Sequence, residues 1–118
     1  MKGDKKIIVI GGGASGMVAA ISAARLGAFV TILERNPRIG KKILTTGNGR
    51  CNFTNVNNDI SFYHGTNPKF AYGALSQFTV YDTIRFFDEL GIEHKVEERG
   101  KVFPMSDQAS SVLDVLMY

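Results

Sequence analysis

The sequence has a single cysteine, Cys51, among its 118 residues. One cysteine excludes an internal disulfide and a dithiol redox pair within this chain, and it fits a reducing compartment such as the cytoplasm. Long apolar runs are missing as well. No stretch approaches the roughly 20 apolar residues that cross a membrane, and the run at residues 7–10 ends at glycines. We therefore expect a cytoplasmic protein with no signal peptide and no contact with a membrane.

Clustered charge is also scarce. Lys and Arg number 14 against 11 Asp and Glu, which leaves a net charge of +3, and the basic residues are scattered. Because a nucleic-acid surface is typically a clustered stripe of Lys and Arg, we expect no nucleic-acid partner. His64 and His94 lie far apart and neither has the spacing of metal ligands, so we expect no metal site.

The hydrophobic fraction of 44% and the charged fraction of 21% are typical of one globular domain with a core of its own. Residues 5–10 end in four β-branched residues and precede glycines, as in a short buried strand. Residues 14–26 are rich in alanine, and Gly27 stands where a helix C-cap belongs. Residues 29–33 form a second apolar run. Residues 5–34 therefore predict a Rossmann-like βαβ unit with parallel strands in an α/β fold.

The rest of the chain divides into two parts. Residues 35–67 show no helical or alternating period, and structureless loops of this length are commonly functional, so we interpret them as a cofactor loop. Residues 68–118 predict a helical and short-strand segment. Its expected elements are a helix from Asn67-Pro68 to about residue 78, a helix from Thr79 to Gly91 with Asp82 in its first turn, strands near 94–98 and 102–103, and a helix from Ser106-Asp107 onward.

Two further expectations concern the core and the extent of the chain. Phe78, Tyr81, Phe86 and Phe87 are expected in the core. The last helix reaches Tyr118 without a Gly, Asn or Pro to end it, so we expect 1–118 to be the N-terminal part of a longer protein.

The glycines Gly11, Gly13 and Gly16 form the pattern G-x-G-x-x-G, which follows a predicted strand and opens a predicted helix. We expect Gly11 to permit a tight turn where a Cβ would clash, and Gly13 to let a pyrophosphate approach the backbone. Gly16 is expected to let the helix lie close to the strands. The first N–H groups of the helix have no partners within it and favour an anion. The pattern therefore predicts dinucleotide binding.

Glu34 ends the second predicted strand, where its carboxylate can accept hydrogen bonds from both hydroxyls of an adenosine ribose. It would repel a 2′-phosphate, so NADP is disfavoured at this site. FAD and NAD both use this motif. The long loop favours FAD, because Gly40 would let the backbone pass close to the ribose and pyrophosphate, and Gly47 and Gly49 would do so nearer the flavin. Arg50 suits either a phosphate or flavin carbonyl, or a salt bridge within the loop.

The chain resembles a group of bacterial flavoproteins, the NAD(P)/FAD-dependent oxidoreductases or aminoacetone oxidase family FAD-binding enzymes, which include bile-acid reductase relatives. Residues 7–16, Glu34, residues 100–104 and residues 106–109 fit this family. The most specific part of the resemblance is the run Gly40-Lys41-Lys42-Ile43-Leu44-Thr45-Thr46-Gly47-Asn48-Gly49-Arg50-Cys51-Asn52-Phe53-Thr54-Asn55.

The resemblance implies FAD as cofactor, a small-molecule substrate and NAD(P)H as a possible electron donor. It also implies the N-terminal part of a discontinuous FAD domain of the two-dinucleotide-binding type, inactive without later segments. It leaves the catalytic residues and the oligomeric state unknown. The residues expected to hold the cofactor are Gly11, Gly13, Ala14, Ser15, Gly16, Glu34, Arg35, Gly40, Lys41, Lys42, Gly47, Gly49, Arg50, Cys51 and Asn52.

Several alternatives stay open at this point. The site could serve a non-catalytic dinucleotide sensor or an NAD-only dehydrogenase, because a fold does not determine a function. Cys51 is either a flavin-facing thiol or, as is more common for free cysteine, a buried hydrophobe. Asn52 either contacts the cofactor or bonds the loop backbone in a local turn.

Overall fold

The computed structural model describes residues 4–118 and contains four helices and five strands within that range. In chain order they are β1 (Lys6–Ile10), α1 (Ala14–Arg25), β2 (Phe29–Leu33), β3 (Thr54–Asn55), α2 (Tyr72–Gln77), α3 (Val80–Glu89), β4 (His94–Val96), β5 (Lys101–Pro104) and α4 (Ala109–Met117). Short 3₁₀ turns occur at Ile43–Gly49, Ile60–Phe62, Pro68–Ala71 and Glu98–Gly100.

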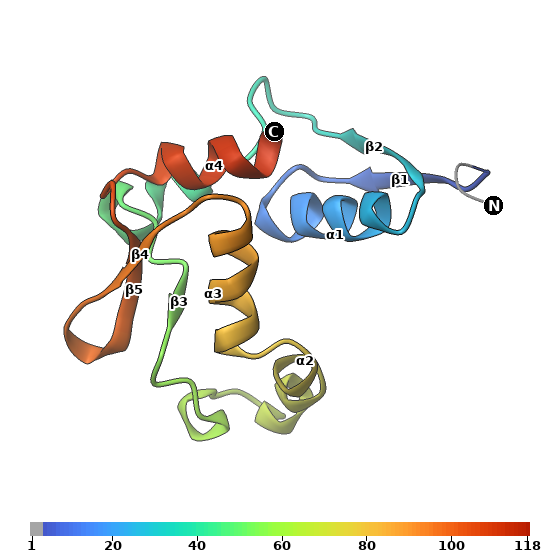
Figure 1. Cartoon of the computed structure of the whole chain (residues 1–118). Helices are drawn as coiled ribbons and strands as arrows, with labels where there is room; N and C mark the ends of the chain where they lie inside the picture. The colour runs from blue at the N-terminus through green and yellow to red at the C-terminus, as the bar shows by residue number, and fades with distance from the viewer. Residues whose placement is uncertain (1–3) are drawn as a thin grey trace.

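The first three elements form the predicted βαβ unit. β1 and β2 pair in parallel with Lys6 opposite Phe29 and Ile10 opposite Leu33, and α1 covers one face of the pair (Figure 1). The observed bounds differ from the predicted ones by one residue at the start of β1 and at the end of α1. The α/β class with parallel strands is therefore confirmed.

The face of β1 and β2 opposite α1 is open. The side chain of Val9 lies against α1 at Gly16, whereas its neighbour Ile10 is 87% exposed. Ile8, Phe29 and Leu33 are exposed as well. Because parallel strands are usually covered on both faces, this part of the chain leaves one apolar face of the sheet without a layer over it.

The second half of the chain builds a small antiparallel sheet with the order β3-β5-β4, and α3 lies beside it (Figure 1). α4 packs on α1 and on residues 43–49, and so it joins this half to the βαβ unit. Met17 of α1 and Leu113 of α4 are each only 1% exposed at that contact, and the buried cluster continues to Ile43 and Phe87. One core therefore connects the two halves.

Two predicted element boundaries are wrong in informative ways, and one predicted helix cap is confirmed. The last helix begins at Ala109 rather than at residue 106, because Asp107 has a φ of +56° that no α-helix can contain. The segment after Asn67 is a 3₁₀ turn followed by α2 rather than one helix, and the Asn67 side chain caps neither. The predicted cap at Thr79 is confirmed, since Thr79 and Asp82 form a reciprocal capping box.

The predicted loop 35–67 has more local structure than its composition indicates. Ile43–Gly49 forms 3₁₀ turns that are interrupted at Thr46, Gly47 and Asn48, and Thr54–Asn55 adds an edge strand to β5. Short 3₁₀ turns have no strong hydrophobic period, which explains why the sequence pattern misses them.

The core prediction is confirmed for two aromatic residues and wrong for two. Phe86 and Phe87 of α3 are buried and pack edge to face, with ring centroids 5.2 Å apart. Tyr81 is 75% exposed and Phe78 is 48% exposed. Both lie where α3 meets the lobe formed by residues 60–78, which projects from the rest of the molecule (Figure 1).

Gly40 tests how tightly α4 packs on the first half. It has a φ of +67°, and an added Cβ would overlap Leu113 Cδ1 and lie 3.1 Å from Met17 Cε. We expect Gly40→Ala to lower the free energy of unfolding by about 2–4 kcal/mol through backbone strain and overpacking. Gly49→Ala is the matched control, because Gly49 also has a positive φ of +85° but an added Cβ there meets nothing within 4 Å. Urea denaturation should show the smaller loss for Gly49→Ala, and equal losses would contradict this packing.

Candidate functional site, a glycine corner beside an apolar cavity

The corner between β1 and α1 presents the start of a helix without a side-chain cap. The Gly11 N–H donates to the Leu33 carbonyl at 2.8 Å, which ties the end of β1 to β2. Gly13 is the N-cap and supplies no side chain to the first N–H groups of α1. Ala14 and Ser15 follow it and are exposed. The positive end of the α1 dipole therefore faces open space.

The three glycines of the G-x-G-x-x-G motif have different structural roles. A Cβ on Gly16 would overlap the Gly11 carbonyl oxygen, so the contact of α1 with β1 requires glycine there, as predicted. A Cβ on Gly13 would meet nothing within 4 Å, which leaves its backbone open to a ligand. A Cβ on Gly11 also meets nothing, so the predicted clash at Gly11 is wrong. The φ of +101° is what favours glycine at that position.

The sequence analysis missed Gly12, which is buried at the centre of the corner. An added Cβ would lie 2.5 Å from Ile39 Cγ1. The Gly12 N–H donates to Glu34 Oε1 at 3.1 Å, and the Gly12 carbonyl accepts from the Gly40 N–H at 2.7 Å. The sequence carried one signal for a role of Gly12. Residues 11–13 are three consecutive glycines, and the G-x-G-x-x-G pattern does not require the middle one.

Glu34 follows β2 and turns toward this corner. Its Oε2 accepts from the Asn36 N–H at 3.0 Å, while Oε1 is bonded to Gly12. These two hydrogen bonds hold the pKa of Glu34 below its usual value, and the bond from Asn36 has the larger effect. Glu34 and Arg35 line an open cavity of about 590 Å³ together with Ile10 and Gly11. The corner thus holds a carboxylate that is ionised at neutral pH.

A second cavity, of about 420 Å³, adjoins the start of α1 and has mostly apolar walls. Its walls come from α1, the 43–53 segment, α3 and α4. The lining residues are Ala14, Ser15, Val18, Ile43, Thr46, Cys51, Asn52, Phe53, Phe87, Val112 and Leu116. We call it the apolar cavity. Ala14 and Ser15 are the first residues of α1 and also line this cavity, so the cavity adjoins the start of the helix.

Cys51 faces this cavity as a buried thiol. It is 5% exposed, and burial raises the pKa of its thiol. The hypothesis of a buried cysteine is therefore confirmed, and a thiolate at neutral pH is disfavoured. Asn52 is exposed and lines the same cavity.

The other predicted residues of the loop lie in three different settings. Gly40 and Gly47 have positive φ angles and contact other parts of the protein, Gly40 at Leu113 and Gly47 at the Asn52 backbone. Gly49 is open. Lys41 and Lys42 are exposed and line neither of the two cavities described above.

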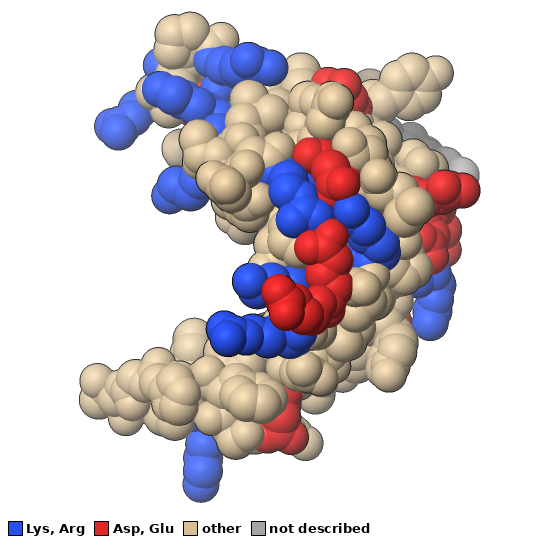
Figure 2. Space-filling model, turned by 90° about the vertical axis from the view of Figure 1, so that its left-hand side faces the viewer, with Lys and Arg blue, Asp and Glu red and all other residues tan. Residues whose placement is uncertain are grey.

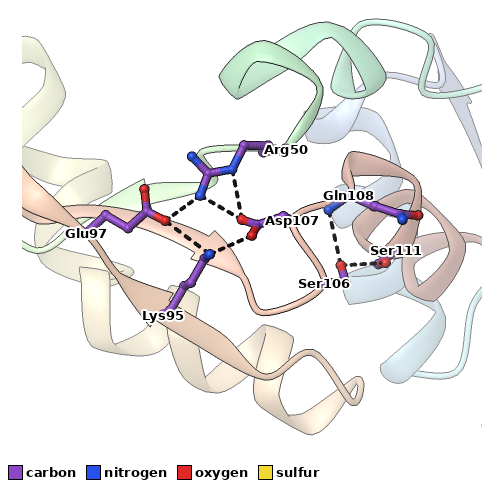
Figure 3. Close-up of polar contacts among 7 residues, drawn as sticks. All are labelled: Arg50, Lys95, Glu97, Ser106, Asp107, Gln108 and Ser111. Atoms are coloured by element: carbon purple, nitrogen blue, oxygen red, sulfur yellow. Dashed lines mark hydrogen bonds and ion pairs between the residues drawn. The ribbon is translucent and has the colours of Figure 1, made fainter.

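Arg50 lines neither cavity and forms ion pairs instead. Its guanidinium bonds Glu97 and Asp107 (Figure 3) and lies 3.9 Å from the centre of the Phe103 ring. Of the two roles that the sequence left open for Arg50, the geometry matches the salt bridge. Asp107 and Glu97 were not predicted to take part, because nothing local in the sequence relates them to Arg50.

Two kinds of site are not found between residues 4 and 118. The described side chains include no group of three His, Cys, Asp or Glu residues that could hold a metal ion. No helix in this range is both long enough and apolar enough to cross a membrane.

Known proteins of similar sequence include two reductases and a synthase. The chain is 55% identical over 113 residues to the 3-dehydro-bile acid delta(4,6)-reductase of Clostridium scindens, a match that covers 94% of this chain and 27% of that protein. It is 38% identical over 109 residues to the ribosomal RNA dihydrouridine synthase of Haemophilus influenzae, which covers 92% of this chain and 27% of the relative. A digeranylgeranylglycerophospholipid reductase 2 of Methanothermobacter thermautotrophicus is 51% identical over 41 residues, which is 35% of this chain and 11% of that protein.

The chain thus spans about a quarter of the length of the first two relatives, 27% in each case. A family model described as the HI0933-like protein Rossmann domain matches residues 5–118, a range that includes the glycine corner, Glu34 and the apolar cavity. The chain belongs to the HI0933-like Rossmann-domain family, which is related to oxidoreductases.

Proposed function

We propose that this chain provides the adenosine, diphosphate and part of the flavin contacts of an FAD-dependent oxidoreductase. One observation carries the proposal. The uncapped start of α1 and the Glu34 carboxylate face the same corner, which Gly12 joins by a hydrogen bond to Glu34. The N–H groups at a helix start bind a diphosphate, and a carboxylate beside them can accept hydrogen bonds from the hydroxyls of the attached ribose.

The residues of this chain would bind and orient the cofactor. Backbone N–H groups of residues 14–16 would hold the diphosphate, and the open backbone at Gly13 lets it approach. Glu34 would accept from the ribose hydroxyls and repel a 2′-phosphate. The apolar cavity would exclude water from one side of a flat ring next to the diphosphate. FAD, when bound, supplies two-electron hydride chemistry.

The comparisons support an oxidoreductase over a non-catalytic sensor. Two relatives are named as reductases, one of them at 55% identity. We propose NAD(P)H as the electron donor to the whole protein and a cytoplasmic location, both from the sequence alone. Mass spectrometry of the cofactor that copurifies with the whole protein tests the proposal. FAD is expected, and NAD or no nucleotide would overturn it.

A small-molecule substrate fits the charge distribution better than a nucleic acid. In Figure 2, acidic and basic side chains alternate in the middle of the face, and other basic side chains lie at one corner and along the edge of the hollow. A nucleic-acid surface typically carries a more extended basic stripe. One relative is nevertheless named for ribosomal RNA, so RNA is the second candidate substrate. Binding of ribosomal RNA by the whole protein, measured across salt concentrations, distinguishes the two.

The open backbone at Gly13 gives a direct test of the diphosphate site. Gly13→Val should abolish FAD binding, because the side chain would fill the approach to the α1 start, while the fold persists since an added Cβ meets nothing within 4 Å. Gly73→Val in α2 is the matched control, as Gly73 also has open space around it. Flavin fluorescence titration measures binding and circular dichroism measures the fold. Unchanged FAD binding by Gly13→Val would remove the basis for the site.

Glu34→Ala should weaken FAD binding by about tenfold to a hundredfold through the loss of hydrogen bonds to a charged acceptor. Glu89→Ala is the control, because Glu89 is an exposed carboxylate on α3. The measurement is isothermal titration with FAD and, separately, with ADP. If ADP binds both variants equally well, the ribose does not lie at Glu34.

The pH dependence of FAD binding should follow the lowered pKa of Glu34. Ionised Glu34 contributes to FAD binding above its pKa in the folded protein, which is below the ordinary value of about 4.3, and the contribution is lost as the pH falls through that lowered pKa. Affinity should therefore be flat from about pH 8 to about pH 5 and fall only in more acid solution. Glu34→Gln should lack this acid step, and a step of equal size in that variant would assign it to another group.

A further inference from the structure

Four charged side chains form a closed ring on the outside of the 47–52 loop (Figure 3). Arg50 bonds Glu97 and also bonds Asp107, with Nε at 2.8 Å from Oδ1. Lys95 Nζ lies 2.7 Å from Asp107 Oδ2 and 3.1 Å from Glu97 Oε2. Each cation therefore contacts both carboxylates, and the four formal charges cancel. We call this set the charge ring.

The charge ring joins three segments that are distant in sequence. Arg50 comes from the loop, Lys95 lies in β4 and Glu97 just after it, and Asp107 lies in the turn before α4. The Arg50 guanidinium also stacks on the ring of Phe103, a buried residue of β5. The loop is thus attached through one arginine to the small sheet and to the turn that leads into α4.

The loop has an unusual backbone that needs such an attachment. Gly47, Asn48, Gly49 and Cys51 all have positive φ values, between +55° and +85°. For Asn48 and Cys51 this conformation is disfavoured relative to the right-handed or extended regions, so neighbouring contacts must hold it. Arg50 is the residue between them that has strong side-chain bonds to the rest of the protein.

We infer that the charge ring is a positioning device for the loop, and that Arg50 keeps Cys51 and Asn52 at the wall of the apolar cavity without contacting the cofactor. Cys51 and Asn52 directly follow Arg50 in the chain and line that cavity, whereas Arg50 itself does not. The importance of this wall for FAD rests on the proposed function, but the loop geometry does not.

The arrangement favours arginine specifically. A planar guanidinium can reach two carboxylates and stack on an aromatic face at once, whereas an ammonium is a point charge on a flexible stem. Isolated surface ion pairs contribute little, but a network in which every charge has two partners holds a fixed geometry. Loss of one carboxylate should therefore loosen the loop even though that carboxylate is outside the cavity.

Cys51 is the single cysteine of residues 1–118, and its labelling in the whole protein, located by peptide mass spectrometry, gives a readout that does not need FAD. Arg50→Lys and Asp107→Asn should each raise the rate at which an aromatic disulfide reagent labels Cys51, about tenfold or more, because the loop opens more often. Rates are compared at equal folded fraction, taken from urea denaturation. Arg85→Lys is the control, since Arg85 pairs with Asp82 on α3, away from the loop. Unchanged labelling in Arg50→Lys and Asp107→Asn would overturn the inference.

Titration of the same variants with FAD completes the test. Asp107→Asn should weaken FAD binding and shift the visible spectrum of the bound flavin. Faster labelling with unaltered FAD binding would mean that the loop wall does not position the cofactor. Loss of FAD binding in Arg50→Lys without faster labelling would mean that Arg50 contacts the cofactor, which also overturns the inference. If the unmodified chain does not bind FAD, the proposed function fails while the labelling result still decides whether the ring holds the loop.

Discussion

The close contact between α1 and β1 is the constraint on which the site depends. A Cβ on Gly16 would overlap the Gly11 carbonyl oxygen, so the helix reaches this position only with glycine there. The contact places the uncapped start of α1 at the carboxyl end of β1, next to the end of β2. Glu34 is the first residue after β2, and the Gly12 N–H binds it. The anion site and the acidic group thus lie together because two backbones approach closely.

The apolar cavity depends on a different part of the chain. Its far wall comes from Val112 and Leu116 of α4, which packs on α1 through Leu113 and Met17. Gly40 stands at that contact and also donates to the Gly12 carbonyl in the corner. The packing of α4 and the geometry of the glycine corner are therefore linked through one residue, which sequence reasoning assigned to cofactor approach.

Local features could be predicted from the sequence, and long-range ones could not. The βαβ unit, the packing role of Gly16 and the Thr79–Asp82 cap each follow from residues close in sequence. The bond from Arg50 to Asp107 spans 57 residues, and it comes with a left-handed Asp107 that no periodic pattern indicates. The burial of Phe86 and the exposure of Tyr81 are also decided by packing, because both are aromatic residues of the same helix.

The two sides of the site are held by forces that respond to different conditions. On the α1 side the contacts are steric and apolar, so changes of salt or of moderate pH leave them in place. On the loop side the charge ring is partly exposed, and the pKa values of Glu97 and Asp107 are lowered by the cations beside them, Arg50 first for Glu97 and Lys95 first for Asp107. Protonation of these carboxylates in acid weakens the ring, whereas the apolar contact of Met17 with Leu113 involves no titrating group. The loop wall is therefore the side of the cavity whose position depends on charged contacts, whereas the α1 side depends on apolar packing.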